Sequence, residues 1–236
     1  MRIALDVMGS DLGVAEMVTG AALVSTDRRF NAEVVLVGDA DEIDNALKGL
    51  KYNPARLSIV PAESHISQKD KPREALEDKI GNSLQVATRL VSEGDADAMV
   101  SAGNTGAVIL SAARSFSRLP GIRRTALAAV YPTEQGHGPH DDPFALMLDV
   151  GATLHVEAYD LAVFAVMGSA YARVISDNQN PKVALLSNGT EPSKGAPEVV
   201  EAHRIISELP AVNFMGNVEG LDIPRGTADV IVCEGF

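Results

Sequence analysis

The sequence predicts an α/β fold, a three-layer α/β/α arrangement in which helices cover a mainly parallel sheet. Short runs rich in β-branched residues alternate with longer helix-like segments along the 236 residues, and this alternation is typical of parallel sheets with helical crossovers. Hydrophobic residues make up 46% of the chain and charged residues 22%, as in ordinary folded domains. No repeat or low-complexity linker interrupts the pattern, so we expect a single α/β domain over residues 1–236.

The expected elements follow one another regularly. The strands are short apolar runs bounded by turn residues: Arg2–Val7, Glu33–Val37, Leu57–Val60, Ala98–Val100, Leu127–Tyr131, Ala145–Asp149, Lys182–Leu186, Asn213–Gly216 and Val230–Cys233. The helices have apolar residues at helical spacing: Val14–Ser25, Asp41–Leu50, Ser83–Ser92, Thr105–Phe116, Tyr159–Ile175 and Glu198–Glu208. The Gly- and Pro-rich segment Glu134–Pro143 predicts a surface loop or hairpin connection.

Composition excludes several classes of function. The formal net charge of −12 argues against nonspecific binding to nucleic acid or to an anionic membrane surface. Apolar stretches such as Leu161–Met167 are far shorter than the roughly 20 residues of a membrane span. The chain enters a strand at Arg2 without a signal-peptide pattern, and its one cysteine, Cys233, agrees with a reducing compartment. We therefore expect a cytoplasmic protein.

The segment Val100–Ala107 is the strongest candidate for a ligand site. It is small and hydroxyl-rich and lies between a strand and a helix, so unpaired N–H groups at the helix N-terminus would face an anion such as phosphate. Gly103 and Gly106 would permit positive φ and close backbone approach, while Ser101, Asn104 and Thr105 would add side-chain donors. The alternative is an ordinary N-capped turn without a ligand.

Other chemical readings are weaker. His137, His140, Asp141 and Asp142 match no standard metal-ligand spacing, so we expect no metal site there. No Gly-x-Gly-x-x-Gly motif follows the first strand, which argues against a dinucleotide site. Cys233 lies in an apolar strand pattern and is interpreted as a small core residue.

Several loops together resemble the phosphate acyltransferase family of bacterial phospholipid synthesis. The segments that carry the resemblance occur in family order along the chain: Ala4–Gly9, Val37–Asp39, Lys71–Pro72, Asp97–Ala107, Gly121–Leu127, Leu148–Ala152, Phe164–Gly168, Asn188–Glu191 with Lys194–Gly195, Gly216–Gly220 and Asp229–Phe236. The chain departs from the family at Ser10, Pro192 and Thr153. It also stops within a family motif, so we expect it to lack the family's C-terminal helical region.

The resemblance implies a fold similar to that of isocitrate and isopropylmalate dehydrogenases. It implies an acyltransferase that makes acyl-phosphate from fatty acyl-carrier protein and inorganic phosphate, as the first step toward phosphatidic acid. It further implies no cofactor, a homodimer, and a peripheral link to the inner face of the membrane. Phosphate is already an anionic nucleophile and a thiolate leaves readily, so we expect positioning and oxyanion stabilisation to supply most of the acceleration.

Roles are carried over to the matching residues. Phosphate would be held by Ser101, Gly103, Asn104, Thr105 and Gly106, and the catalytic residues would be Lys194, Asp149, Asp6 and Glu191. Further substrate contacts would come from Gly9, Asn188, Thr190, Gly151 and Asn217. Arg114, Arg118, Arg123 and Arg124 would dock the acidic carrier protein, with Lys69, Lys71 and Arg73 as a second cationic run. Each has a structural alternative: Asp149 as a turn cap, Lys194 as an exposed lysine and the arginines as surface charge.

Two other functions stay open at this point. A phosphotransacetylase-like enzyme using an acyl-coenzyme A thioester would need the same phosphate cradle. A chain of this length would also suit an inactive phosphate-binding or subunit-interaction module.

Overall fold

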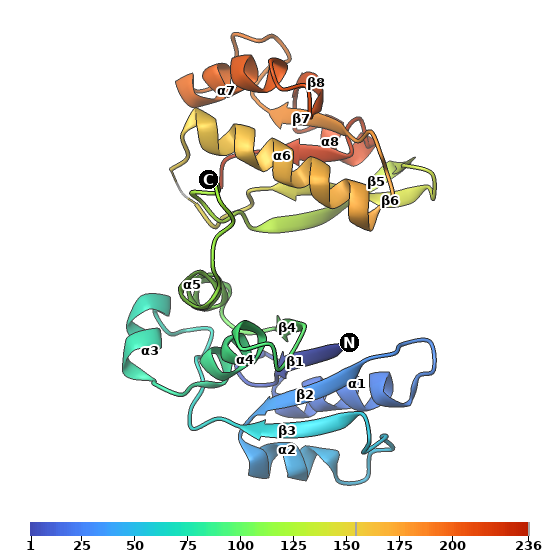
Figure 1. Ribbon diagram of the computed structural model, residues 1–236, viewed down its shortest axis with the longest axis vertical. Helices are drawn as coiled ribbons and strands as arrows, with labels where there is room; N and C mark the ends of the chain where they lie inside the picture. The colour runs from blue at the N-terminus through green and yellow to red at the C-terminus, as the bar shows by residue number, and fades with distance from the viewer. Residues whose placement is uncertain (154, 236) are drawn as a thin grey trace. The chain divides into compact units, whose positions relative to one another are not determined.

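The computed structural model describes residues 1–153 and 155–235, and these divide into two compact units. Unit 1 is Met1–Arg118 and unit 2 is Leu119–Phe236, and each is built around a sheet of its own (Figure 1). The predicted α/β class with mainly parallel pairing is confirmed, but the strands form two sheets. That residues 1–236 act as one domain stays a prediction.

Unit 1 has a four-stranded sheet in the order β3-β2-β1-β4, with every pair parallel. Alternate residues of β1 and β2 face opposite layers: Leu5 and Leu36 pack with Val18 and Ile43 on one side, and Ala4 and Val35 pack with Ala87 on the other. Its elements are β1 (Arg2–Asp6), α1 (Val14–Thr26), β2 (Glu33–Gly38), α2 (Ala40–Leu47), β3 (Leu57–Pro61), α3 (Pro72–Asp78), α4 (Ser83–Ser92), β4 (Ala98–Ser101) and α5 (Thr105–Ser115).

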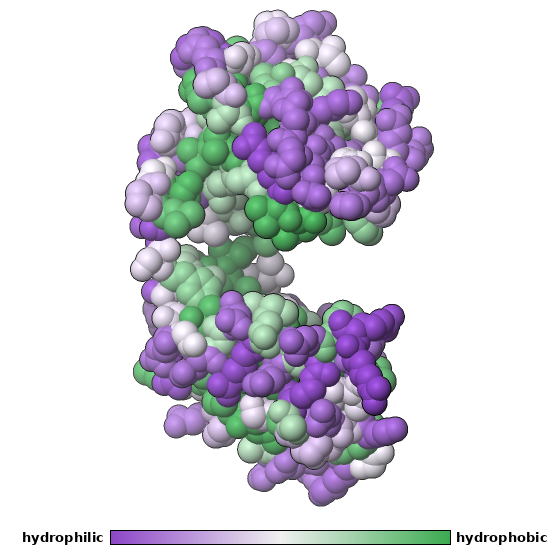
Figure 2. All heavy atoms as spheres, turned by 45° about the vertical axis from the view of Figure 1, so that its right-hand side comes forward, coloured by the Kyte–Doolittle hydropathy of each residue, from purple (hydrophilic) through white to green (hydrophobic). Residues whose placement is uncertain are grey.

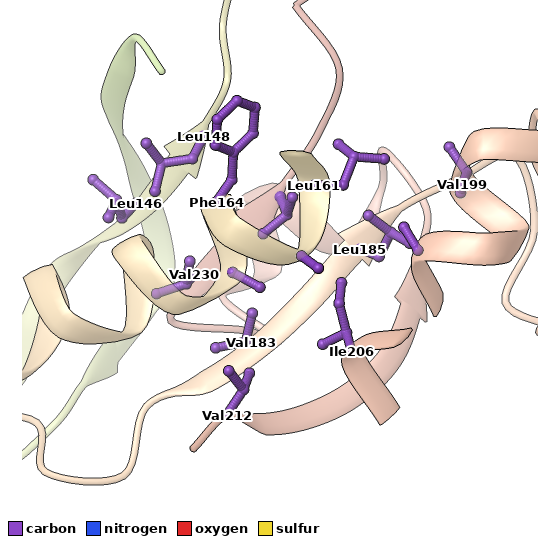
Figure 3. Packing of buried hydrophobic residues seen from close by; sticks show 14 of the residues in the cluster. Leu146, Leu148, Leu161, Phe164, Val183, Leu185, Val199, Ile206, Val212 and Val230 are labelled. Carbon is purple, nitrogen blue, oxygen red and sulfur yellow. The ribbon is translucent and has the colours of Figure 1, made fainter. Parts of the chain in front are cut away.

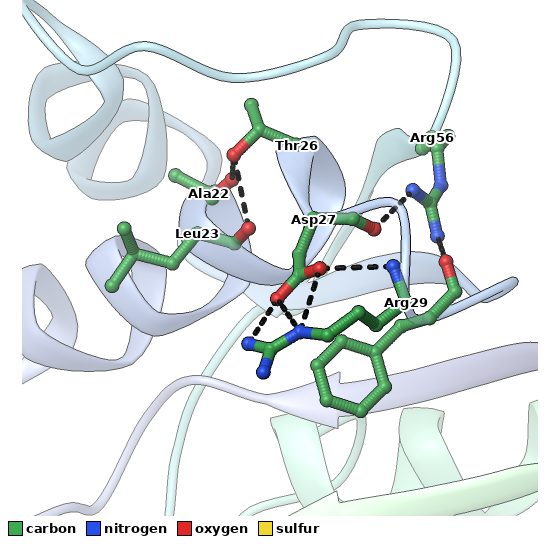
Figure 4. A network of polar contacts seen from close by, with 7 residues as sticks. Ala22, Leu23, Thr26, Asp27, Arg29 and Arg56 are labelled. Atoms are coloured by element: carbon green, nitrogen blue, oxygen red, sulfur yellow. Dashed lines mark hydrogen bonds and ion pairs between the residues drawn. The ribbon is translucent and has the colours of Figure 1, made fainter.

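A polar network fixes the connection from α1 to β2. The Arg56 guanidinium donates to the backbone carbonyls of Ser25, Asp27, Phe30 and Ala32, and Asp27 pairs with Arg29 at 2.6 Å (Figure 4). Because one guanidinium satisfies several backbone carbonyls, it orders the connection that leads into β2. Hydrophilic residues cover much of the visible surface of unit 1 (Figure 2).

Unit 2 has a five-stranded sheet in the order β5-β6-β9-β7-β8. Only the β5–β6 pair is antiparallel, because those two strands form a hairpin. The elements are β5 (Ala128–His137), β6 (Asp142–Leu148), α6 (Ala158–Ile175), β7 (Lys182–Leu186), α7 (Pro197–Ser207), β8 (Asn213–Val218), α8 (Asp222–Arg225) and β9 (Val230–Val232).

Helix α6 forms the centre of the core of unit 2. Leu161 and Phe164 are fully buried against strand residues that include Leu148, Val183 and Val230 (Figure 3). The helix has 18 residues and a mean hydropathy of 1.3, so by length and composition it is a candidate membrane span, contrary to the sequence expectation. Core helices meet the same criteria, and 44% of this helix is buried inside the unit.

Every strand and helix expected from the sequence overlaps an observed element of the same type, and Lys182–Leu186 and Ser83–Ser92 have the expected ends. Helices α3 and α8 were not expected. The segment Glu134–Pro143 is a hairpin whose strands extend to His137 and from Asp142, so the hairpin alternative is the correct one and only its tip is a loop.

Candidate functional site

The parallel pairing of β1 with β4 brings Asp6 and Ser101 side by side at the carboxyl ends of their strands. Ser101 Oγ donates to Asp6 Oδ2 at 2.7 Å and accepts from Gly103 N at 3.1 Å. Asp6 Oδ1 accepts from Met8 N at 3.1 Å. The serine hydroxyl proton is therefore committed to Asp6, and Ser101 acts through the shape of the loop that follows it.

Asp6 is almost completely buried. Burial raises the pKa of this carboxyl above its ordinary value, although hydrogen bonds from Ser101, Ser83 and Met8 and the charge of His65 act in the opposite direction. Desolvation dominates because only a few donors compensate the buried charge. This carboxyl is thus easier to protonate than an exposed aspartate.

Asn104 is the N-cap of α5, as the alternative reading of this loop proposed. Its Oδ1 accepts from Ala107 N at 3.1 Å. Its Nδ2 donates to the carbonyls of Ser67, Gln68 and Asp70 at 3.3, 3.4 and 3.0 Å. Both ends of the amide are engaged, so Asn104 fastens the segment after β3 to the start of α5. A direct contact of this side chain with phosphate stays a prediction.

The two glycines of this loop allow close approach of neighbouring atoms to the backbone. Neither Gly103 nor Gly106 is among the described glycines with positive φ, so the positive φ that glycine would permit is not used here. A Cβ at Gly103 would lie 3.2 Å from Ser101 Oγ, and one at Gly106 would lie 2.7 Å from Pro72 Cγ. A Cβ at Gly106 would therefore collide with Pro72, whereas one at Gly103 would make a tight contact with the Ser101 hydroxyl.

These bonds leave Thr105 and Gly106 as the donors at the start of α5. Their backbone N–H groups donate to no atom in the part of the chain that the structure describes, as is usual for the first two positions of a helix. The Thr105 side chain is exposed beside them. Two N–H groups and a hydroxyl at the positive end of an eleven-residue helix form a suitable anion site.

In unit 2, Asp149 organises the loop after β6. Its Oδ1 accepts from the N–H groups of Leu127, Gly151 and Ala152, and its Oδ2 accepts from Thr153 N, at distances of 2.7 to 3.2 Å. Asp149 is fully buried, and Gly151 adopts φ +130°, which turns the chain back over the carboxylate. The geometry is that of a turn cap; a catalytic role stays a prediction.

The other predicted residues of unit 2 gather in the loop between β7 and α7. Asn188, Thr190, Glu191 and Lys194 are exposed there. The buried Asn217 of β8 holds this loop through Nδ2, which donates to the Glu191 carbonyl at 2.9 Å, while its Oδ1 lies 2.9 Å from His203 Nδ1. Asn217 therefore positions the loop. A pocket of about 300 Å³ lies at the start of α7, lined in part by Ser187, Asn188 and Gly195.

The four arginines predicted to dock a carrier protein differ in their environments. Arg114 pairs with Glu77 at 3.1 Å. Arg123 pairs with Glu157 at 2.8 Å and with Asp160 at 3.3 Å, and its guanidinium lies 4.8 Å from the centre of the Tyr159 ring. Arg124 is exposed. These ion pairs neutralise part of the positive charge that the sequence suggested.

One polar cluster was missed by the sequence analysis. The buried His137 lies 2.8 Å from Asp229 Oδ1 through Nδ1 and 3.0 Å from Thr133 Oγ1 through Nε2. Burial would raise the pKa of Asp229, but hydrogen bonds from His137 and from Lys182 N hold it below the ordinary value. The residues are 92 positions apart, so no spacing rule could pair them. The cluster fastens the hairpin to the segment that precedes β9. Among the described residues, no three or more His, Cys, Asp or Glu side chains are grouped so that they could hold a metal ion.

Comparisons with known proteins agree with one another. A family model described as "Fatty acid synthesis protein" matches residues 1–236. The chain is 43% identical to a phosphate acyltransferase of Nostoc punctiforme over all of its length and 67% of the relative's length. It is 41% identical to a phosphate acyltransferase of Dictyoglomus turgidum, of which it covers 68%.

Solved structures point to the same group of folds. A phosphotransacetylase from Streptococcus pyogenes aligns with a TM-score of 0.71 and 25% identity, over 99% of this chain and 77% of that one. A branched-chain phosphotransacylase from Enterococcus faecalis aligns with a TM-score of 0.60 at 14% identity, over 99% of this chain and 79% of that one. The second likeness concerns the fold alone.

Proposed function

The chain belongs to the phosphate acyltransferase family, and we propose that it transfers the acyl group of a fatty acyl-carrier protein to inorganic phosphate. The observation that carries the proposal is the start of α5, where Thr105 and Gly106 present two N–H groups and a hydroxyl. Members of this family are enzymes by name. The family model links them to fatty acid synthesis, which favours a fatty acyl thioester as substrate.

The proposed reaction needs no redox step and no cofactor. A phosphate oxygen attacks the thioester carbonyl and forms a tetrahedral intermediate. The intermediate collapses as the C–S bond breaks, and the sulfur leaves as a thiolate that is protonated from solvent. The products are an acyl-phosphate and the free thiol of the carrier. Phosphate is anionic at neutral pH and thiols have a pKa near 8.5, so activation by a strong base is unnecessary.

Unit 1 would supply the phosphate site of this reaction. The positive end of α5 attracts the anion, and the Thr105 hydroxyl donates a further hydrogen bond. Asp6 and Ser101 act as positioning residues: the Asp6 carboxylate fixes the serine hydroxyl at 2.7 Å, and the serine oxygen fixes Gly103 N at 3.1 Å. Preorganised donors of this kind require no rearrangement as charge develops.

Unit 2 would supply a cation, Lys194, and loops that contact the thioester substrate. Lys194 is exposed and its N–H donates to the Glu191 carbonyl at 3.0 Å, so the lysine starts from a defined turn. We propose that its ammonium neutralises phosphate or the oxyanion. Asn188 and Thr190, with Gly151 in the Asp149 loop, would contact substrate. Asn217 and Asp149 would act indirectly, because their polar atoms already hold these loops.

The remaining parts of the proposal concern partners and location. The reaction would be the first step toward phosphatidic acid, and the enzyme would act as a cytoplasmic homodimer with a peripheral link to the membrane. Arg124, exposed next to the Arg123–Glu157 pair, would contact the acidic carrier protein. Replacement of Arg124 by Glu should raise KM for the carrier substrate and flatten its salt dependence.

A second candidate is supported by the phosphotransacetylase from Streptococcus pyogenes, at 25% identity and a TM-score of 0.71. In that case the thioester would be an acyl-coenzyme A. Parallel assays with acetyl-coenzyme A, long-chain acyl-coenzyme A and long-chain acyl-carrier protein separate the two, because kcat/KM should be highest for the true donor.

The decisive experiment replaces Thr105 by Val and, as a matched control, by Ser. The valine keeps the shape and removes the hydroxyl, and the serine keeps the hydroxyl. Loss of one donor to an anion should lower kcat/KM for phosphate by roughly tenfold or more in the Val variant, while the Ser variant stays within about twofold of the parent. Equal turnover in all three proteins, together with unchanged turnover in Lys194→Met, would remove the phosphate-site assignment.

A further inference from the structure

Unit 1 contains a pocket to which no ligand has yet been assigned, although Gly9, one of the predicted substrate contacts, lies in its lining. It has a volume of about 500 Å³ and is lined by loop residues between Met8 and Val14 after β1, by Glu42 of α2, and by His65 and residues 67–69 after β3. Its size is within the range of small-molecule sites. The carboxyl end of a parallel sheet is also where α/β proteins bind ligands.

The pocket shares a wall with the proposed phosphate site. Gln68 Nε2 donates to the Ala102 carbonyl at 3.1 Å, and Asn104 Nδ2 donates to the Ser67 carbonyl at 3.3 Å. On the other side, a Cβ at Gly9 would lie 3.5 Å from Gly103 Cα and 2.6 Å from the Ile66 carbonyl oxygen. The loop after β1, the segment after β3 and the start of α5 are therefore packed into one body, within a single unit.

The lining has the character of a site for an extended polar chain. Ser10, Ser67 and Gln68 offer hydroxyl and amide groups, and Met8 and Val14 offer apolar surface. The charged groups facing the pocket are Lys69, Asp11 and Glu42, with His65 beside them. Asp11, Glu42 and Lys69 are all exposed, so the two carboxylates disfavour a multiply charged anion, whereas Lys69 can pair with a single anionic group.

We propose that this pocket holds the phosphopantetheine arm of the thioester substrate, with the arm's phosphate at Lys69 and its sulfur toward Gly9 and Gly103. The inference rests on the proposed function, because that reaction requires a thiol carrier next to phosphate. The arm is a neutral chain with two amide groups that ends in a phosphate group, so its charge distribution matches the lining. It occurs both in coenzyme A and in acyl-carrier proteins, and the pocket recognises the shared part.

The placement also explains the cationic run after β3. Lys71 pairs with Glu74 at 3.1 Å, so part of the charge of this run is neutralised. Lys69 is the cation of the run that lines the pocket. The sequence run Lys69, Lys71 and Arg73 thus contains one residue at the substrate pocket and others outside it.

The test compares Lys69→Glu with the charge-matched control Lys51→Glu. Lys51 precedes β3 and Lys69 follows it, so both changes are on exposed residues of the same unit, at opposite ends of one strand. Binding of 4′-phosphopantetheine and of unphosphorylated pantetheine is measured by calorimetry. The parent and Lys51→Glu should bind the phosphorylated arm several-fold more tightly than the unphosphorylated one, and Lys69→Glu should lose roughly tenfold for the phosphorylated arm only.

Kinetics then identify the source of the arm and separate this inference from the proposed function. Lys69→Glu should raise KM for the thioester while KM for phosphate stays within about twofold. A larger KM effect with acyl-carrier protein than with acyl-coenzyme A assigns the arm to the carrier. Active enzyme with unchanged thioester KM and unchanged arm binding in Lys69→Glu refutes the pocket and leaves the proposed function intact. Lys69-dependent binding without transfer from any thioester supports the pocket and refutes the function.

Discussion

Asp6 and Asp149 occupy equivalent positions in the two units, yet their surroundings differ. Each is buried at the carboxyl end of a strand and begins a loop. Asp149 accepts four backbone N–H groups, whereas Asp6 accepts one backbone N–H and hydrogen bonds from the side chains of Ser101 and Ser83. A carboxylate surrounded by N–H donors stabilises a fold, and one with few donors keeps a capacity to change its protonation or its partners.

A one-residue difference in sequence accounts for the contrast. The loops read Asp6-Val-Met-Gly9 and Asp149-Val-Gly-Ala152. Gly151, two positions after its aspartate, has φ +130°, so the chain curls and aims successive N–H groups at Asp149. Gly9 comes three positions after Asp6, and its neighbour in space is the Ile66 carbonyl. The Asp149 loop therefore closes on its carboxylate, whereas the Asp6 loop opens toward the rest of unit 1.

The largest expected effect is on the stability of unit 2 in Asp149→Asn. The NH2 group of the new asparagine would face at least one of the four backbone N–H donors, which then loses its acceptor. The other donors would bind a neutral carbonyl oxygen instead of a charged carboxylate. We expect a loss of about 2–3 kcal/mol in the free energy of unfolding, measured by urea denaturation. Asp6→Asn serves as the matched control and should cost less than about 1 kcal/mol. Similar losses in the two variants would contradict the comparison.

The second prediction concerns activity, where the order reverses. In Asp6→Asn a neutral amide replaces the carboxylate that accepts the Ser101 hydroxyl. The Ser101 oxygen is then no longer fixed as the acceptor for Gly103 N. We expect kcat/KM for phosphate to fall by roughly tenfold, with rescue absent in Asp6→Ala and partial in Asp6→Glu. A merely structural role predicts that activity follows the folded fraction. Full activity in folded Asp6→Asn would show that this aspartate does not position the phosphate site.

Local residues predicted much of this arrangement. The alternating pattern located every expected strand and helix, and strand ends located Asp6, Asp149 and the loop after Val100. The number of donors around each carboxylate depends on backbone curvature and on distant residues, such as Leu127 for Asp149. Asn104 was expected to be a phosphate ligand. Its three carbonyl partners lie in residues 67–70, and because they are remote in sequence, the sequence did not indicate that its side-chain amide binds them.

The elements that were missed are short or depend on long-range contacts. Helix α3 has seven residues, of which only Ala75 and Leu76 are buried, so no helical period can be detected. Helix α8 is a single turn that contains Pro224. The hairpin to His137 depends on Asp229. Division into two sheets likewise follows from which strands pair, and a sequence of alternating elements does not contain that information.

The third prediction is a pH effect that Asp6 should produce. Its pKa is raised by burial, so between the unfolded value near 3.8 and the higher folded value the folded state binds more protons. Stability therefore gains from this group as pH falls through the folded pKa, and the ionised group is a cost at neutral pH. The parent should gain stability relative to Asp6→Asn between about pH 7 and about pH 4.5, measured by urea denaturation. A relative loss over that range would reverse the sign and disprove the assignment.

The smallest effect uses Cys233 to report on the Asp149 loop. Burial, and then the negative charges of Asp149 and Glu234, raise the pKa of this thiol to about 11, and Cys233 Sγ lies 3.0 Å from the Asp149 carbonyl. The native protein should therefore react slowly with a thiol-specific chromogenic disulfide at about pH 8. Asp149→Asn should react several-fold faster because its loop opens more often, whereas Asp6→Asn should match the parent. Fast labelling of the native parent would show that the carboxylate with four donors does not hold its loop closed.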